Sequence, residues 1–368
     1  MLFFPVKDQY KFLQKKIHNN LNKTLLHNKF ILGPEVEILE NKLKKYTKSK
    51  FCITTSSCTD SLLMSLMSIN INAGDEVITS AFTYISSLEV ICLLGAKPIL
   101  VDVDKKTANI DYKKLNRKIN SRTKAIIVTS LYGNMADYDE INKIAKKNDI
   151  VVIEDAAQSF GSKYKNIRSC NVSEIGCTSF FPTKILSCYG DAGAIFTNNK
   201  KIATKLIEIR SHGQNKKYNH KSIGLCARMD TIQASILLAK LSNFKNELKK
   251  RELIAKKFDS HLSKLFLNNE CYRIINNKYS SSNNYLYTIV FHNRKKLIYK
   301  LNESKIPYMI YYAKSLNKQP AYKKFFLNQK YENADFLSKN SISIPCHPYL
   351  NLNEQSKILS IFTSISKK

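Results

Sequence analysis

The sequence lacks any apolar stretch long enough to cross a membrane. A membrane helix needs about 20 mainly apolar residues, and the best candidate, residues 81–101, contains Glu89, Lys97 and Pro98. The N-terminal segment, MLFFPVKDQYKFLQKK, also lacks the succession of basic, apolar and small residues that marks a secretory signal. The sequence therefore predicts neither a membrane span nor a signal peptide.

The cysteines lack the spacing of a metal site or of a disulfide framework. Their number, 9, is odd, and no two of them form a CxxC pair. They stand at positions 52, 58, 92, 170, 177, 188, 226, 271 and 346. We expect reduced thiols in a cytoplasmic enzyme and no metal ligands.

Acidic residues are scarce beside basic ones. Lys and Arg number 59 against 29 Asp and Glu, which gives a formal net charge of +30. Such an excess is typical of nucleic-acid-binding proteins. Here, however, the lysines are scattered among asparagine and isoleucine, as in INKIAKKNDI, and no helix-turn-helix, zinc motif or basic aromatic sheet motif accompanies them. Lysine, asparagine and isoleucine all have A/T-rich codons, so we interpret the positive charge as compositional drift in an A/T-rich genome. The charge would also help to attract an anionic substrate, and we expect no nucleic-acid partner.

Short apolar runs alternate with helical patterns, which is typical of an α/β fold. Several runs are apolar without alternation, as expected for strands of a mostly parallel sheet covered on both faces. Helices are predicted over 59–69 and 137–147. Strands are predicted within 51–55, 74–80, 97–104, 124–133, 149–158, 178–181 and 193–198.

The pattern changes from about residue 229. The later part contains a long helical pattern over 229–264, strands at 285–291, near 309–312 and at 342–345, a helix near 295–303 and a final helix from 353. We expect a large domain over residues 1–245, which includes an N-terminal helical segment, and a small α+β domain over 246–368.

Four fragments stand where α/β enzymes usually place catalytic residues, at strand ends. Ser56–Ser61 is a small-residue turn that opens a helix, where free N–H groups suit a phosphate. Ala81–Tyr84 follows a strand with aromatics, Ile153–Gln158 places acids after an apolar run, and Ser179–Lys184 places a lysine after an aromatic strand. Each fragment also has an ordinary interpretation: a helix cap, core aromatics, a charged strand end and a solvated lysine.

Taken together, the four fragments fit pyridoxal phosphate. This cofactor needs a lysine for its Schiff base, an acid for its pyridine nitrogen, a phosphate cup and an aromatic face against its ring. Lys184 and Asp155 supply the first two, 184 − 155 = 29 residues apart.

With these fragments assembled, the chain resembles the DegT/StrS family of nucleotide-sugar aminotransferases, which belongs to the fold type I group of pyridoxal-phosphate enzymes. The resemblance begins at FILGPEVEILE, is densest in IGCTSFFPTKILSCYGDAGAIFTNN, and continues through MDTIQASILLAKL, LNKQPAY and IPCHPYL. Gln158, the SFFPTK motif and HGQ resemble the members that aminate a UDP-3-oxo-N-acetylglucosaminuronate for surface polysaccharides such as O-antigen.

The resemblance implies a role for each candidate residue. Lys184 binds the cofactor covalently, and Asp155 holds the pyridine nitrogen protonated. Tyr84 stacks on the ring, and Gln158 lies at its hydroxyl edge. The phosphate is held by Ser179, Thr59 and the backbone at Cys58; Cys226 reaches a partner's phosphate, Arg228 enters from the other subunit of a homodimer, and Tyr311 and Tyr312 lie near the sugar.

Three positions depart from the family pattern. Cys58 stands where the family usually has glycine, so its side chain is expected to shift the loop. Cys226 replaces an asparagine, and cysteine is a weak donor. Tyr311 replaces a histidine near the sugar, which puts the identity of the sugar in doubt.

We expect an aminotransferase that takes an amino group from glutamate and transfers it to UDP-2-acetamido-2-deoxy-3-oxo-glucuronate. The alternatives are a 4-keto nucleotide-sugar aminotransferase, or a nucleic-acid-binding or regulatory protein with a degenerate site. The dehydratase branch of the family has histidine in place of the Schiff-base lysine, and Lys184 argues against it.

Overall fold

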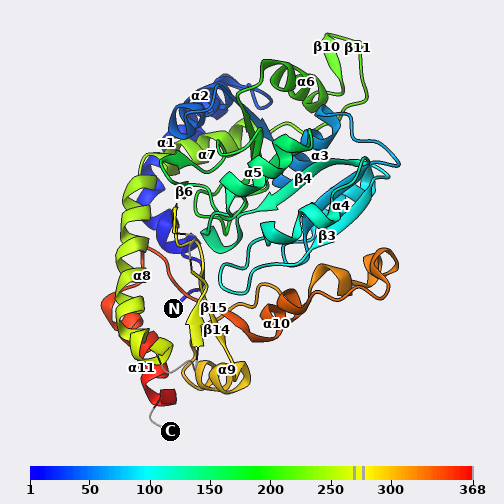
Figure 1. The fold of residues 1–368 in the computed structure, drawn as a ribbon. Helices are drawn as coiled ribbons and strands as arrows, with labels where there is room; N and C mark the ends of the chain where they lie inside the picture. The colour runs from blue at the N-terminus through cyan, green and yellow to red at the C-terminus, as the bar shows by residue number, and fades with distance from the viewer. Residues whose placement is uncertain (268–270, 276–277, 367–368) are drawn as a thin grey trace.

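The computed structural model describes residues 1–267, 271–275 and 278–366. Its centre is a seven-stranded sheet in the order β1-β9-β8-β5-β4-β2-β3 (Figure 1). All of these strands run in one direction except β9, which is antiparallel to both of its neighbours. The strands are β1 (Phe51–Thr55), β2 (Glu76–Ser80), β3 (Lys97–Val101), β4 (Thr123–Thr129), β5 (Val151–Asp155), β8 (Ile175–Ser179) and β9 (Gly193–Thr197). The predicted α/β class with a mostly parallel sheet is confirmed.

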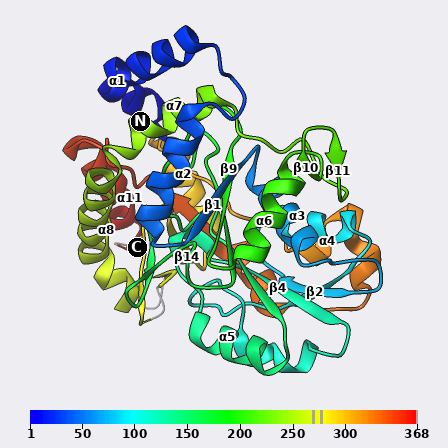
Figure 2. The same cartoon turned by 90° about the horizontal axis from the view of Figure 1, so that it is seen from above.

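Helices cover both faces of this sheet because alternate residues of each strand point to opposite sides. Ile53 of β1 packs in a core with Leu62 and Leu206, whereas the neighbouring Cys52 packs in a core with Leu39. Figure 2 shows α2 and α6 on opposite sides of β1 and β9. The helices of these layers are α1 (Val6–His27), α2 (Pro34–Thr47), α3 (Cys58–Ser68), α4 (Ser86–Leu93), α5 (Tyr138–Lys147), α6 (Lys200–Arg210) and α7 (Thr231–Leu241).

A second, antiparallel sheet forms the other part of the molecule, in the order β12-β14-β15. It has its own core, in which Ile289 and Ile342 meet Phe258 and Phe362 from two of the covering helices. Its elements are α8 (Phe244–Leu267), β12 (Cys271–Arg273), β14 (Tyr287–Phe291), α9 (Arg294–Glu303), α10 (Glu332–Asn340), β15 (Ser341–Ile344) and α11 (Leu352–Ser366) (Figure 1). The predicted division between residues 245 and 246 falls in the first turn of α8 and stays a prediction.

Two expected elements take a different form. The helical pattern over 229–264 forms two helices, because Ser242 and Asn243 bond to neighbouring backbone between α7 and α8: Ser242 Oγ donates to the Ala239 carbonyl over 2.7 Å. The prediction of a strand near 309–312 is wrong beyond Met309. Met309 forms an isolated bridge with Ser343, and the chain then turns toward the main sheet.

Short elements that the pattern did not predict lie in the connections. They are the strands β6 (Lys163–Tyr164), β7 (Ile167–Arg168), β10 (Gln214–Lys216), β11 (Asn219–His220) and β13 (Ser280–Ser281), and the 3-10 helices η1 (Tyr112–Lys114), η2 (Asn116–Lys118), η3 (Leu131–Gly133), η4 (Leu316–Lys318) and η5 (Pro320–Phe326). β13 pairs with β6, so the later part of the chain is hydrogen-bonded to a loop of the main sheet. Across the described ranges, none of the helices has both the length and the apolar character that a membrane crossing requires.

Candidate active site

A cavity of about 320 Å³ opens at the carboxyl edge of the main sheet. Thr129, Asp155 and Ser179 are the last residues of β4, β5 and β8, and parallel strands bring such ends to one edge. Most of the residues singled out from the sequence therefore meet here. The cavity is lined by Cys58, Thr59, Tyr84, Asp155, Gln158, Ser179, Lys184, Tyr311 and Tyr312, among others.

One end of the cavity is the N-terminus of α3. Ser57 is the N-cap, and its hydroxyl accepts the Asp60 N–H over 3.0 Å. The helix begins at Cys58 with this cap formed, and the expected shift of the loop by the Cys58 side chain stays a prediction. Gly193 allows the approach of the turn, because a Cβ there would lie 2.6 Å from the Ser57 carbonyl carbon. The positive helix end and the nearby Thr59 hydroxyl suit an anion such as phosphate.

Asp155 lies on the floor of the cavity and receives several donors. Its Oδ2 accepts the Thr129 hydroxyl over 3.1 Å and the Ser87 hydroxyl over 3.3 Å. Its Oδ1 accepts the Ala157 N–H over 3.1 Å and lies 4.0 Å from Cys58 Sγ. Burial raises the pKa of the Asp155 carboxyl, while these hydrogen bonds oppose that rise.

Lys184 lies in a turn that follows β8. Its backbone N–H donates to the Phe181 carbonyl over 2.8 Å, and its side-chain Nζ lies 5.3 Å from the centre of the Tyr285 ring. Burial lowers the pKa of Lys184, and the charge of Asp155 partly opposes that change. An amine with a lowered pKa is more often neutral, which is the form that acts as a nucleophile or a base.

The opposite wall joins the two parts of the molecule. The Gln158 side chain accepts the Tyr132 N–H over 2.7 Å and donates to the Tyr312 hydroxyl over 3.1 Å. The Tyr132 hydroxyl donates to the Tyr311 carbonyl. The ring of Tyr84 is 54% exposed and lies 6.0 Å from that of Tyr312. The amide of Gln158 thus ties the end of β5 to the aromatic wall.

Cys226 and Arg228 lie elsewhere. Among the described residues of the chain, neither of them lines this cavity. Arg228 Nη2 donates to Cys226 Sγ over 3.0 Å, and the cysteine is exposed. Within one subunit, these two candidates are therefore separate from the other nine.

The sequence reasoning missed several residues of the cavity. Thr129 carried the same signal as Asp155, a polar residue at the end of a buried strand, and could have been found in this way. Tyr285 carried no such signal, because its position depends on a contact between distant segments. The missed lining residues outside the four fragments are Ser86, Thr129, Asp191, Ala192 and Tyr285, whereas Ser57, Ala157, Phe181 and Thr183 lie within the fragments but were given no role of their own.

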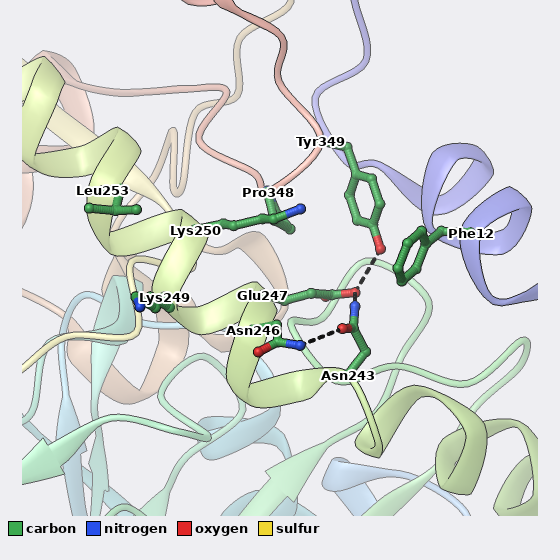
Figure 3. A pocket seen from close by; sticks show the side chains of 9 residues that line it. All are labelled: Phe12, Asn243, Asn246, Glu247, Lys249, Lys250, Leu253, Pro348 and Tyr349. Carbon is green, nitrogen blue, oxygen red and sulfur yellow. Dashed lines mark hydrogen bonds between the residues drawn. The ribbon is translucent and has the colours of Figure 1, made fainter.

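A second cavity, of about 350 Å³, lies between α1, the start of α8 and the loop that contains Tyr349 (Figure 3). Its acid, Glu247, accepts Gln9 Nε2 over 2.9 Å, the Tyr349 hydroxyl over 2.8 Å and Asn243 Nδ2 over 3.4 Å. These donors occupy the carboxylate, so we interpret this place as a structural junction of α1 and α8.

Comparisons with known proteins agree with this geometry. The chain is 42% identical, over 95% of its length and 96% of the relative's, to a UDP-2-acetamido-2-deoxy-3-oxo-D-glucuronate aminotransferase of Pseudomonas aeruginosa. A crystal structure of a DegT DnrJ EryC1 StrS aminotransferase from Brucella abortus matches with a TM-score of 0.94 and 33% identity over 100% of both chains. NtdA from Bacillus subtilis, solved with bound cofactor PMP, matches with a TM-score of 0.93 and 28% identity over 100% of this chain and 85% of its own. Residues 11–363 match the family profile, and the chain belongs to the DegT/DnrJ/EryC1/StrS aminotransferase family.

Proposed function

We propose that this protein is a pyridoxal-phosphate-dependent aminotransferase that transfers the amino group of glutamate to UDP-2-acetamido-2-deoxy-3-oxo-glucuronate. One observation carries the proposal: Lys184, an amine with a lowered pKa, lies in the same cavity as the Asp155 carboxylate, which accepts several hydrogen bonds. The 42% identity to the Pseudomonas aeruginosa enzyme supports this substrate. The product would serve surface polysaccharide synthesis in the cytoplasm.

The groups in the cavity fit pyridoxal phosphate. The N-terminus of α3, with the hydroxyls of Thr59 and Ser179, would hold the phosphate, and Asp155 would pair with the ring nitrogen. Tyr84 would cover the ring, and Lys184 would bind it covalently. When bound, the cofactor supplies an electron sink that is strong while its ring nitrogen is protonated.

The chain's own residues would then divide the work. Asp155 would remain an anion beside the ring nitrogen, because Thr129 and Ala157 donate hydrogen bonds to it. The Lys184 amine would accept and return a proton at Nζ, for which its lowered pKa is suited. Gln158, held at both ends, would keep the Tyr312 wall in place.

The sugar would lie against Tyr311 and Tyr312. Both rings line the cavity, and the basic surface would attract the anionic nucleotide. A 4-keto nucleotide sugar remains the alternative substrate, since Tyr311 replaces the histidine of the family at this wall.

The site would be shared between the two subunits of a homodimer. Arg228 and Cys226 lie outside the cavity of their own subunit. Large apolar side chains are exposed on the surface: Ile223, which precedes Cys226 by three residues, is 86% exposed, and Leu26 of α1 is 82% exposed. A two-fold axis would bring Arg228 of the partner subunit to the substrate, where its guanidinium suits a carboxylate or phosphate.

Reconstitution with pyridoxal phosphate tests the reaction. We expect a visible absorbance band that glutamate removes and the 3-oxo sugar restores, with a 4-keto sugar far less effective. A protein that binds the cofactor but responds to no amino acid and no sugar nucleotide would contradict the proposal.

Mixed dimers test the shared site. One pocket of a heterodimer between Lys184→Ala and Arg228→Ala subunits would carry both changes, and the other pocket neither. We therefore expect activity to return on mixing two inactive variants. Mixed dimers without activity, or an active monomer, would contradict the shared site.

A further inference from the structure

A threonine in the loop after β2 and a threonine at the end of β4 form a chain of hydroxyls that ends on Asp155. Thr83 follows β2 and donates to Thr129 over 2.8 Å; Thr129 ends β4 and donates to Asp155 Oδ2 over 3.1 Å. The three side chains are nearly inaccessible, with residue exposures of 2% for Thr83, 5% for Thr129 and 2% for Asp155. They meet because Thr129 and Asp155 are register partners on adjacent parallel strands.

The direction of these bonds follows from the acceptor at the end. A threonine hydroxyl has one proton to donate, and a carboxylate has none. If Thr129 gives its proton to Asp155, its lone pairs are available to Thr83, and each bond polarises the next. The Ala157 N–H can only donate, and it faces the other carboxylate oxygen over 3.1 Å. Because Thr83 donates to Thr129, the Thr129 proton is left for Asp155 Oδ2. The Ser87 hydroxyl also donates to this oxygen over 3.3 Å, and this set of donors favours the anionic form of Asp155.

We propose that Thr129, oriented by Thr83, is a positioning residue that keeps Asp155 anionic and aimed at the cofactor's ring nitrogen; this inference rests on the proposed function. The need for such a group is physical. Burial favours the neutral carboxyl, and the donors within reach counter it together with the charge of Lys184. Thr129 supplies such a donor while remaining part of the sheet.

The chain offers a matched control for this proposal. Thr79 of β2 is also buried, with 0% of its surface exposed, and its hydroxyl has no hydrogen-bond partner in the part of the chain that the structure describes. Thr79→Val makes the same chemical change as Thr129→Val, in the same sheet, without removing a donor from Asp155. A purely structural effect of replacing a buried threonine would appear in both variants.

The experiment compares Thr129→Val, Thr129→Ser, Thr83→Val and Thr79→Val in the holoenzyme. Loss of a hydrogen bond to a charged group changes an equilibrium by about 10- to 100-fold. We expect Thr129→Val to lower kcat by about that factor with KM little changed, and to weaken pyridoxal phosphate binding. Thr129→Ser should stay near wild type, Thr83→Val should fall between them, and Thr79→Val should match wild type.

NMR of pyridoxal phosphate labelled at the ring nitrogen gives a readout that does not depend on turnover. In Thr129→Val the ring-nitrogen shift should move toward the unprotonated value, and in Thr129→Ser and Thr79→Val it should not. A Thr129→Val variant that matches Thr79→Val in this shift and in kcat overturns the inference, as does failure of Thr129→Ser to restore them. If only thermal stability changes, the role is structural and the inference is wrong.

The same series separates this inference from the proposed function. If wild type binds pyridoxal phosphate and Asp155→Ala abolishes turnover, a neutral Thr129→Val refutes only the hydroxyl chain. If wild type binds no pyridoxal phosphate, the proposed function fails and this inference fails with it.

Discussion

Two successive acids in β5 end in different surroundings. Asp155 points into the cavity, where the Thr129 hydroxyl and the Ala157 N–H donate to it. Glu154 points to the opposite face, is 0% exposed, and accepts the Ser169 hydroxyl over 2.8 Å and the Cys170 N–H over 2.7 Å. Burial raises the pKa of Glu154 to about 8. Being buried, acidic and hydrogen-bonded therefore does not mark a site residue; Asp155 differs in lining the cavity and in lying near the charge of Lys184.

Two buried lysines make the same comparison. Lys184 faces the cavity, whereas Lys240 of α7 is 2% exposed, donates to Ser187 Oγ over 3.1 Å and lies 4.2 Å from the Tyr189 ring centre. Burial lowers the pKa of Lys240 to about 8. We interpret Lys240 as a residue that stabilises the loop after Lys184. The predictions below compare the cavity residues Lys184 and Asp155 with the buried residues Lys240 and Glu154.

The largest effect is expected at Lys184. Lys184→Ala removes the amine that the reaction requires, so turnover should be abolished while the circular dichroism spectrum is unchanged. Measurable transamination in this variant, with glutamate as donor, would show that another group does this work.

Asp155 should come next. Asp155→Ala leaves the ring nitrogen without an anionic partner and should lower kcat by several orders of magnitude. Asp155→Glu keeps the charge at a displaced position and should be milder. Steady-state kinetics of both variants check this order, and an Asp155→Ala variant like wild type would leave the acid with no role beyond ending a strand.

Lys240→Met should affect stability rather than chemistry. We expect kcat to fall less than about tenfold, since Met retains the packing of the stem. The folded pKa of Lys240, about 8, is below the ordinary 10.5, so the unfolded chain binds more protons between these values. Wild-type stability should thus rise with pH across that window by roughly 1.4 kcal/mol per unit, and the variant should lack this rise in denaturant titrations.

Glu154→Gln should have the smallest effect on turnover. The folded pKa of Glu154, about 8, is above the ordinary 4.5, so the folded protein holds an extra proton between these values. Wild-type stability should fall as pH rises through that window, by roughly 1.4 kcal/mol per unit, and Glu154→Gln should not follow it. Unfolding midpoints of wild type and Glu154→Gln, measured across this pH range, test the prediction. If the two midpoints change with pH in parallel, Glu154 is ionised in the folded protein and the prediction is wrong.

The class of fold and the family could be predicted from local patterns in the sequence. Apolar runs without alternation predict covered parallel strands, and polar residues at the ends of these runs predict a site at one edge. This was sufficient to predict that Lys184 and Asp155 lie at that edge, because Asp155 ends one strand signal and Lys184 follows another within a few residues, while their roles stay predictions. It also predicted that the N-terminus of α3 would suit an anion, since a small-residue turn before a helix is a local feature.

Which distant groups meet could not be predicted in this way and follows from the assembled fold. Thr83 and Thr129 are 46 residues apart, and Gln158 and Tyr312 are 154 apart. No local pattern encodes such pairs, because strand order and the turn after Met309 bring them together. The register of β4 against β5 sets Thr129 beside Asp155, and alternation along β5 turns Glu154 away. A single residue of strand slip would exchange the two faces, which is why the acid's surroundings follow from the assembled sheet and not from its neighbours in sequence.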